Sequence, residues 1–383
     1  MEIIITPDAL RDELRMFNGL VGRDSALMEM SNLLIETAHD KIFISGTDGE
    51  VSLRTEISGE HFEEVSPGAV CIKADKLTDV LGTLDGKVKS IRLREEANGW
   101  TNLLFGRSHF RISGIKAELY PKIKVSRKEG SEAVSFPAGL LLQFLASTSH
   151  AISSQDTQYV MTGAHLAVGG MSKMTATDGF RVASIESPIA GAFDGIFPKK
   201  AISIINKLLA EVSPEALVEI SGEPNHIFLS VGNKRLSFRK LNGDFPNVAG
   251  VLNVENDHKV LLNLYDLRAA IRRADIFADK NNQSSVTLTV RPGEIEIHAK
   301  SFEEGSGDEL IDAQYDGPEV VLRIKSGFLV DFFNSVNMEG PAANITLSME
   351  FSAGDTKPTI WTVHRDKDVE LGYDYKCLIT KLR

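Results

Sequence analysis

Cysteine is scarce in this sequence: Cys71 and Cys377 are the only two among 383 residues, and no CxxC pair occurs. This usage argues against a disulfide framework or a structural zinc site and fits a reducing compartment. Long apolar runs are also missing, because no segment approaches the roughly 20 residues that are needed to cross a membrane. Glu2 stands where a secretion signal would carry positive charge, so we expect a cytoplasmic protein.

The familiar catalytic motifs are missing as well. The sequence has no HExxH, GxSxG or GxGxxG, and its nine histidines are scattered. The stretch GTLDGKVKS at 82–90 differs from a P-loop, because Val88 stands where Ser or Thr would hold magnesium. We therefore expect no catalytic residue, metal or cofactor. A multidomain α+β enzyme stays open as an alternative, because catalytic carboxylates can leave no local trace.

One short phrase occurs twice in the chain, as Thr47–Gly49 and as Thr177–Gly179, both reading Thr-Asp-Gly. An Asp-Gly pair between runs of alternating apolar residues predicts a tight turn between two strands. A helical pattern follows each phrase, over 73–84 and 198–212. Strand patterns come next in both places, and an aromatic-proline pair ends each series.

A third series starts near residue 254 and repeats this order, and it reads Lys300-Ser301-Phe302 where the phrase would fall. The sequence thus predicts an α+β fold of three similar domains, each with two helices on antiparallel sheet. We place them at 1–124, 125–253 and 254–383. Their spacing of about 130 residues is too long for a solenoid, so each copy should have its own core.

Basic residues recur on the predicted helices, although the chain as a whole has a net charge of −11. At least four of the six helices place two of them opposite the apolar face: Arg11 and Arg15, Lys73 and Lys76, Lys200 and Lys207, Arg268 and Arg272. Lysine and arginine facing phosphates bind nucleic acid without sequence preference. The pattern predicts a positive strip within an acidic exterior, and no base-reading element accompanies it.

The order of these segments resembles the bacterial sliding clamp family, the beta subunit of DNA polymerase III. The resemblance covers essentially the whole chain. Three segments carry it: ISSQDTQYVMTGAHLAV leading into TATDGFRVAS, then LNGDFPNV, and VGRDSAL. It implies a non-catalytic processivity factor for DNA replication, in which two crescents of three domains close head to tail into a ring with helices lining the hole.

The resemblance also assigns roles to individual residues. It implies contact with double-stranded DNA by five of them: Arg23, Lys76, Gln155, Tyr159 and Lys199. It places Phe110 and Ile112 of a first-domain edge strand at the seam of the homodimer. Opposite them it places Ile276 and Phe277, at the end of a third-domain helix.

A pocket for short peptides is implied between the second and third domains. The partners would be the DNA polymerase III alpha subunit, the clamp loader complex, and other polymerases and repair proteins that carry clamp-binding peptides. The matching positions are Met161, Thr177, Gly179, Phe180, Arg181, Val182, Pro246, Val251, Phe328, Leu378, Ile379 and Leu382.

Three features depart from the family's pattern in this pocket. Phe180 follows the second phrase where histidine is usual, Gly250 stands where arginine is frequent, and the chain ends in CLITKLR. We expect these changes to alter which peptides bind. A ring-shaped scaffold that no longer binds DNA is a further alternative, and retention on circular against linear DNA separates it from a clamp.

Overall fold

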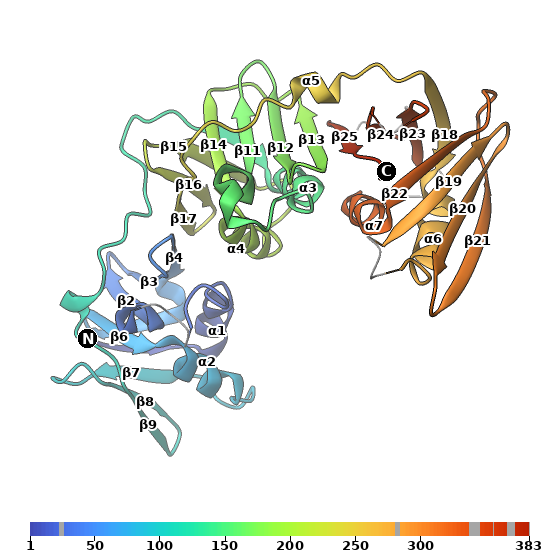
Figure 1. Ribbon diagram of the computed structural model, residues 1–383. Coiled ribbons are helices and arrows are strands. Elements are labelled where there is room, and N and C mark those ends of the chain that lie inside the picture. The colour runs from blue at the N-terminus through green and yellow to red at the C-terminus, as the bar shows by residue number, and fades with distance from the viewer. Residues whose placement is uncertain (23–26, 280–283, 337–344, 355, 366–371, 383) are drawn as a thin grey trace. The chain divides into compact units, whose positions relative to one another are not determined.

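The computed structural model describes residues 1–22, 27–279, 284–336, 345–354, 356–365 and 372–382. The chain divides into two compact units. The first unit comprises residues 1–139 and 200–240, and the second comprises residues 140–199 and 241–383. Figure 1 labels most of the helices and strands of both.

The first unit contains two antiparallel sheets. Five strands form one of them, in the order β5-β1-β7-β8-β9: β1 Glu2–Ile5, β5 Phe62–Ser66, β7 Ile91–Glu95, β8 Thr101–Phe105 and β9 Ser108–Ile112. Eight strands form the other, in the order β10-β15-β16-β17-β4-β3-β2-β6: β2 Asn32–Ala38, β3 Lys41–Thr47, β4 Val51–Ser58, β6 Ala69–Lys73, β10 Val134–Pro137, β15 Leu217–Gly222, β16 His226–Val231 and β17 Lys234–Arg239.

The second unit also contains two antiparallel sheets. Eight strands form the larger one, in the order β14-β11-β12-β13-β25-β24-β23-β18: β11 Gly163–Val168, β12 Ser172–Thr177, β13 Arg181–Ser187, β14 Phe193–Pro198, β18 His258–Asn263, β23 Ile345–Phe351, β24 Thr359–Arg365 and β25 Asp374–Ile379. Four strands form the smaller one, in the order β21-β20-β19-β22: β19 Ser285–Arg291, β20 Glu294–Ser301, β21 Gly305–Asp312 and β22 Val320–Lys325.

Among the described residues, the helices match the six that the sequence predicts, with one addition. Their bounds are α1 Pro7–Arg15, α2 Ala74–Gly82, α3 Ala138–Ser149, α4 Lys199–Leu209, α5 Ala249–Leu252, α6 Leu264–Asp275 and α7 Ser326–Ser335. The addition is α5, a single turn whose four residues are too few to show helical periodicity. No helix in the described part of the chain is long and apolar enough to span a bilayer.

The apolar spacing of the sequence explains how these elements pack. Leu10 and Leu14 of α1 are buried one turn apart on the side that faces α2 and β4. Helix α6 starts at an N-cap, where the side chain of Asn263 accepts hydrogen bonds from two backbone N–H groups of the first turn. In β4 every second residue is buried, as expected for a strand with one face on the core.

Sheets run without a break from one sequence repeat into the next. Strand β17 pairs with β4, with Leu236 opposite Leu53, and β25 pairs with β13, with Leu378 opposite Val182. Each compact unit is built around one of these eight-stranded sheets and therefore takes in parts of two neighbouring repeats. The domain boundaries at 124 and 253 stay a prediction.

Two strands lie at sheet edges, although the corresponding strands of the other repeats pair with a neighbouring strand. Strand β9 stands in the same place of its repeat as β17 and β25, and β21 stands in the same place as β4 and β13. Within the described residues, β9 pairs with β8 alone and β21 pairs with β20 alone. Each therefore offers unpaired backbone N–H and C=O groups to another chain.

Candidate peptide-binding site

The two Thr-Asp-Gly phrases form the same turn. In the first, Thr47 Oγ1 donates to the Val51 carbonyl at 2.9 Å and accepts from the Gly49 N–H at 3.1 Å. Asp48 Oδ1 accepts from the N–H groups of Glu50 and Val51, at 2.9 and 2.8 Å. Gly49 has a φ of 91°, a conformation that favours glycine.

The second turn repeats each of these hydrogen bonds. Thr177 Oγ1 donates to the Arg181 carbonyl at 2.8 Å and accepts from the Gly179 N–H at 3.1 Å. Asp178 Oδ1 accepts from the N–H groups of Phe180 and Arg181, both at 3.0 Å, and Gly179 has a φ of 86°. The turn predicted from the Asp-Gly pair is thereby confirmed in both places.

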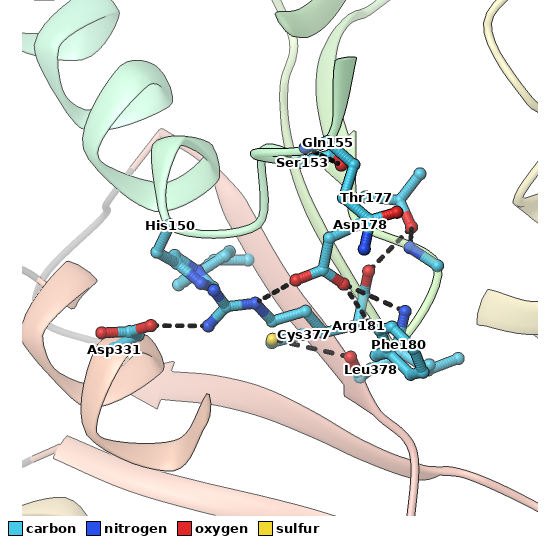
Figure 2. Close-up of polar contacts among 12 residues, drawn as sticks. His150, Ser153, Gln155, Thr177, Asp178, Phe180, Arg181, Asp331, Cys377 and Leu378 are labelled. Atoms are coloured by element: carbon cyan, nitrogen blue, oxygen red, sulfur yellow. Dashed lines mark hydrogen bonds and ion pairs between the residues drawn. The ribbon is translucent and has the colours of Figure 1, made fainter. Parts of the chain in front are cut away.

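The turns differ in the cation that each aspartate holds. Asp48 Oδ2 lies 2.6 Å from the Nζ of Lys200, at the start of α4. Burial alone would lower the pKa of Lys200, but the hydrogen bond and negative charge of Asp48, together with Glu50, raise it. In the second turn Asp178 Oδ2 accepts from Arg181 Nε at 3.0 Å (Figure 2).

Arg181 carries the contact further, to α7. Its second guanidinium nitrogen donates to Asp331 Oδ2 at 2.7 Å, and its side chain is only 9% exposed. Each turn therefore holds the second helix of the following repeat, directly through Lys200 or through Arg181. In the third repeat Ser301 Oγ accepts from the Glu303 N–H at 3.4 Å, as Thr177 does from Gly179. Phe302 then stands where the aspartate would be, and it has no carboxylate with which to hold such a cation.

Next to the second turn lies an apolar floor. Val182 and Leu378 are directly opposite each other on β13 and β25 and are 5% and 4% exposed. They pack with Leu252 of α5, and Val248 lies against the three of them. These contacts bring together residues that are far apart in the sequence, as the predicted pocket requires.

Aromatic rings and the C-terminal segment border this floor. The Arg181 guanidinium lies 4.4 Å from the centre of the Phe328 ring, and Phe180 is 58% exposed. The Phe180 carbonyl accepts from the Thr380 N–H at 3.0 Å, and the Leu382 N–H donates to the Arg323 carbonyl at 2.8 Å. The segment after β25 is therefore fastened both to the second turn and to β22.

The other predicted pocket residues differ in exposure. Thr177 and Ile379 are buried, whereas Gly179, Pro246 and Val251 are exposed. Met161 is partly buried in a 3₁₀ helix, Asp156–Thr162. A side chain added at Gly250 would meet open space, so the lack of an arginine there has no steric cause.

A buried polar network in this part of the second unit was not predicted from the sequence. The Tyr375 hydroxyl donates to the Ser147 carbonyl at 2.8 Å and lies 2.9 Å from His150 Nε2 and 2.7 Å from Ser335 Oγ. Burial, with a smaller effect from the positive charge of Arg181, lowers the pKa of His150 to about 3. No local motif signals this network, because its members come from α3 and the residue after it, from α7 and from β25.

Four of the five residues predicted to contact DNA are described by the structure, and all four lie on exposed surface. Lys76 is 57% exposed on α2 and lies 4.0 Å from Asp79, while Lys199 is exposed at the start of α4. Gln155 is exposed, and Tyr159 is 55% exposed. Arg23 lies outside the described residues. The structure does not bring these side chains to a common ligand.

The basic strip expected on the helices stays a prediction, and several of its members also bind this chain. Arg11 donates to the carbonyls of Leu81 and Leu84, which the end of α2 leaves unpaired. Lys200 pairs with Asp48, as described above. The other members held in this way are Lys207, on the Asn18 carbonyl, and Arg268 and Arg272, on the Asn334 side chain.

The predicted seam residues also differ in exposure. Phe110 is 42% exposed on the edge strand β9 and stacks on Phe105 with ring centres 5.6 Å apart. Ile112 is only 5% exposed, so its side chain already belongs to the core of the first unit and does not present apolar surface. Just after α6, Ile276 is 65% exposed and Phe277 lies against Gly307 at the start of β21.

Repeats of one α+β domain, joined edge to edge by continuous sheets, define the clamp class of proteins. Models of the N-terminal, central and C-terminal domains of the DNA polymerase III beta subunit match residues 1–124, 136–247 and 250–370. The chain belongs to this family. Its role is that of a DNA sliding clamp, a non-catalytic processivity factor, and the family implies DNA and polymerase partners and self-association.

Named relatives are similar to this sequence along most of its length. The beta sliding clamp of Pseudomonas putida is 27% identical over 350 residues, covering 88% of this chain and 91% of the relative. The Staphylococcus epidermidis clamp is 24% identical over 380 residues, covering 96% and 97%.

Solved structures show the same fold. The DNA polymerase III subunit beta from Pseudomonas aeruginosa superposes with a TM-score of 0.87 at 25% identity, covering both chains fully. The sliding clamp from Bacillus subtilis gives a TM-score of 0.89 at 22% identity, covering 100% of this chain and 99% of that one.

Proposed function

We propose that two copies of this chain close head to tail into a ring around duplex DNA. The observation that carries this proposal is the pair of free edges. Within the chain, successive repeats join by pairing β17 with β4 and β25 with β13. The corresponding strands left over are β9 and β21, so one further junction of the same kind requires a second chain.

The seam of this ring pairs β9 of one chain with β21 of the other. Phe110 on β9 and Ile276 next to β21 are the exposed apolar residues that the seam covers. Phe277 supports the strand from behind by packing against Gly307. Ile112 contributes through the core that holds β9 in place.

Exposed cations and polar groups grip the DNA backbone in the hole. Lys76 and Lys199 are the side chains best suited to phosphates, since neither is held as closely as Lys200 is by Asp48. Gln155 and Tyr159 add uncharged contacts, and Arg23 adds a further cation. Few contacts suit a clamp that slides, because each phosphate contact strengthens binding and its dependence on salt.

The apolar floor of Val182 and Leu378 captures short peptides of partner proteins. These partners are the DNA polymerase III alpha subunit, the clamp loader complex and other polymerases and repair proteins. Phe180 and Phe328 provide aromatic walls, and the segment that ends the chain provides a third side. Without an arginine at position 250, the site selects for apolar side chains more than for acidic ones.

The repeats act as three domains, at 1–124, 125–253 and 254–383, in a protein that works in the cytoplasm beside the chromosome. The continuous sheets support rigid junctions between them, because separating two domains would break backbone hydrogen bonds.

Loading by the cognate clamp loader onto nicked circular DNA tests the proposal. We expect the clamp to stay on the circle after a wash at high salt and to leave when one restriction cut makes the circle linear. Equal retention on both forms would show ordinary DNA binding. Failure to be retained on either form would favour a scaffold that does not encircle DNA.

A further inference from the structure

A second hollow lies beside the apolar floor, on the larger sheet of the second unit. It encloses about 260 Å³ between strands β11 and β12 and the segment 245–249. The side chains that matter for its chemistry are His165, Lys173, Thr175, Phe245, Pro246 and Val248. One of these residues, Pro246, also belongs to the predicted peptide pocket.

Two features show that the hollow adjoins the peptide pocket. Val248 lines the hollow and also packs against Val182 and Leu378 of the floor. Thr175 of the hollow and Thr177 of the pocket are two residues apart on β12, so they lie on the same face of the sheet, about 7 Å apart. An extended chain bound at the floor covers that distance with two or three residues.

The walls of the hollow suit an aromatic side chain. Phe245 stacks on the His165 ring with centres 5.2 Å apart and planes inclined by 24°, and the Asp194 carboxylate fixes that imidazole at 2.9 Å. Lys173 is 41% exposed at the hollow, and its ion pair with Glu186 is long, at 3.7 Å. Stacked rings and a loosely held ammonium both attract the face or edge of a further ring.

We propose that this hollow is a second subsite for the same partner peptide and takes an aromatic side chain two or three residues from the apolar anchor. This inference rests on the proposed function of the neighbouring floor. The hollow separates partners into two classes: those with an anchor alone, and those with an anchor and an aromatic residue at the right spacing. The second class binds more tightly and wins when partners compete for one clamp.

Fluorescence anisotropy with synthetic peptides tests the subsite on the intact clamp. The anchor peptide contains a Leu-Phe pair. Extended versions carry Trp, Ala or Glu two or three residues from that pair, before it or after it. At one of these positions we expect the Trp peptide to bind about threefold to tenfold more tightly than the Ala peptide. Equal affinities of the Trp and Ala peptides, or a gain with Glu alone, would overturn the subsite.

Two variants make the result specific. Ala167 also lines the hollow. Ala167→Leu fills the hollow and His165→Ala removes the stacked ring, so both should abolish the gain from Trp and leave the anchor peptide unaffected. Thr289→Leu, on the separate four-stranded sheet, is the matched control and should keep the gain. A gain that survives Ala167→Leu would place the tryptophan elsewhere.

The same titrations separate failure of the subsite from failure of the pocket. Val182→Asp puts a charge into the apolar floor and should abolish binding of the anchor peptide. If the anchor peptide does not bind the unaltered clamp, or binds Val182→Asp equally well, the pocket and the subsite fall together. If it binds as expected but gains nothing from any extension, the subsite alone falls.

Discussion

At the scale of single residues, the two Thr-Asp-Gly turns form an internal comparison. Asp178→Ala and Asp48→Ala remove the same turn hydrogen bonds but leave different cations behind. Arg181 is 9% exposed, whereas Lys200 is 48% exposed and can be hydrated. We expect Asp178→Ala to lower the free energy of unfolding by about 3 kcal/mol and Asp48→Ala by about 1 kcal/mol.

Urea denaturation followed by circular dichroism measures both losses, with Asp331→Ala as a third variant. Asp331 is 47% exposed, so its removal should cost about 1 kcal/mol or less. Equal losses for Asp48→Ala and Asp178→Ala would mean that the turn hydrogen bonds, and not the buried arginine, set the cost.

His150 gives the stability of the second unit a dependence on pH. Burial, with the nearby charge of Arg181, lowers its pKa to about 3, whereas an unfolded histidine titrates near 6.5. The unfolded chain therefore binds the extra proton first, and the contribution of His150 is lost as pH falls from about 6.5 towards 3. We expect acidification to lower the unfolding free energy of wild type more than that of His150→Gln, by up to about 1 kcal/mol per pH unit, because the ring is only partly buried. Parallel pH curves for the two proteins would contradict this.

At the scale of elements, helix α4 begins with two adjacent lysines that differ in their contacts. Lys199 is exposed, and Lys200 is held by Asp48 at 2.6 Å. We expect Lys199→Ala to weaken low-salt binding to duplex DNA and to reduce the slope of log affinity against log salt by about 0.9. Lys200→Ala is the matched control: it should leave that slope nearly unchanged and lower stability by up to about 1 kcal/mol. Equal slopes for both variants would remove Lys199 from the DNA contacts.

The same helix shows what can be predicted from sequence. The apolar spacing of Ile202, Ile205 and Leu208 predicts the helix and its buried face, because both depend on neighbours within two turns. The Asp-Gly pair likewise predicts each turn, whose hydrogen bonds are all local. That Lys200 meets Asp48, and that Tyr375 meets His150, depends on sheets that join distant repeats. No local pattern encodes those contacts, which is why neither the partner of Lys200 nor the buried network was predicted.

At the scale of the whole molecule, the number of repeats and the number of Thr-Asp-Gly turns have one explanation. Each turn precedes a strand, β4 or β13, that pairs with the next repeat of the same chain. In the third repeat the corresponding strand is β21, whose proposed neighbour belongs to another chain, and Phe302 stands in place of the aspartate of the turn before it. At each of the two junctions within the chain, an ion pair thus links the turn to a helix of the next repeat. The proposed seam lacks an ion pair from this aspartate position. We infer that a ring of two chains opens at the seam, because that junction has neither a covalent link nor this ion pair.

Mass measurement on seam variants tests that inference. Wild type should give twice the 41.9 kDa of one chain by light scattering across a dilution series. Ile276→Asp and Phe110→Asp each place a charge on apolar surface that the seam covers, and we expect each to raise the dimer dissociation constant about 30-fold or more. Met171→Asp, at a residue 49% exposed between β11 and β12, is the control and should stay dimeric. If Ile276→Asp stayed fully dimeric at micromolar concentration, the seam would lie elsewhere. A trimer would rule out head-to-tail closure of two chains, because three chains of three repeats do not make a ring of six.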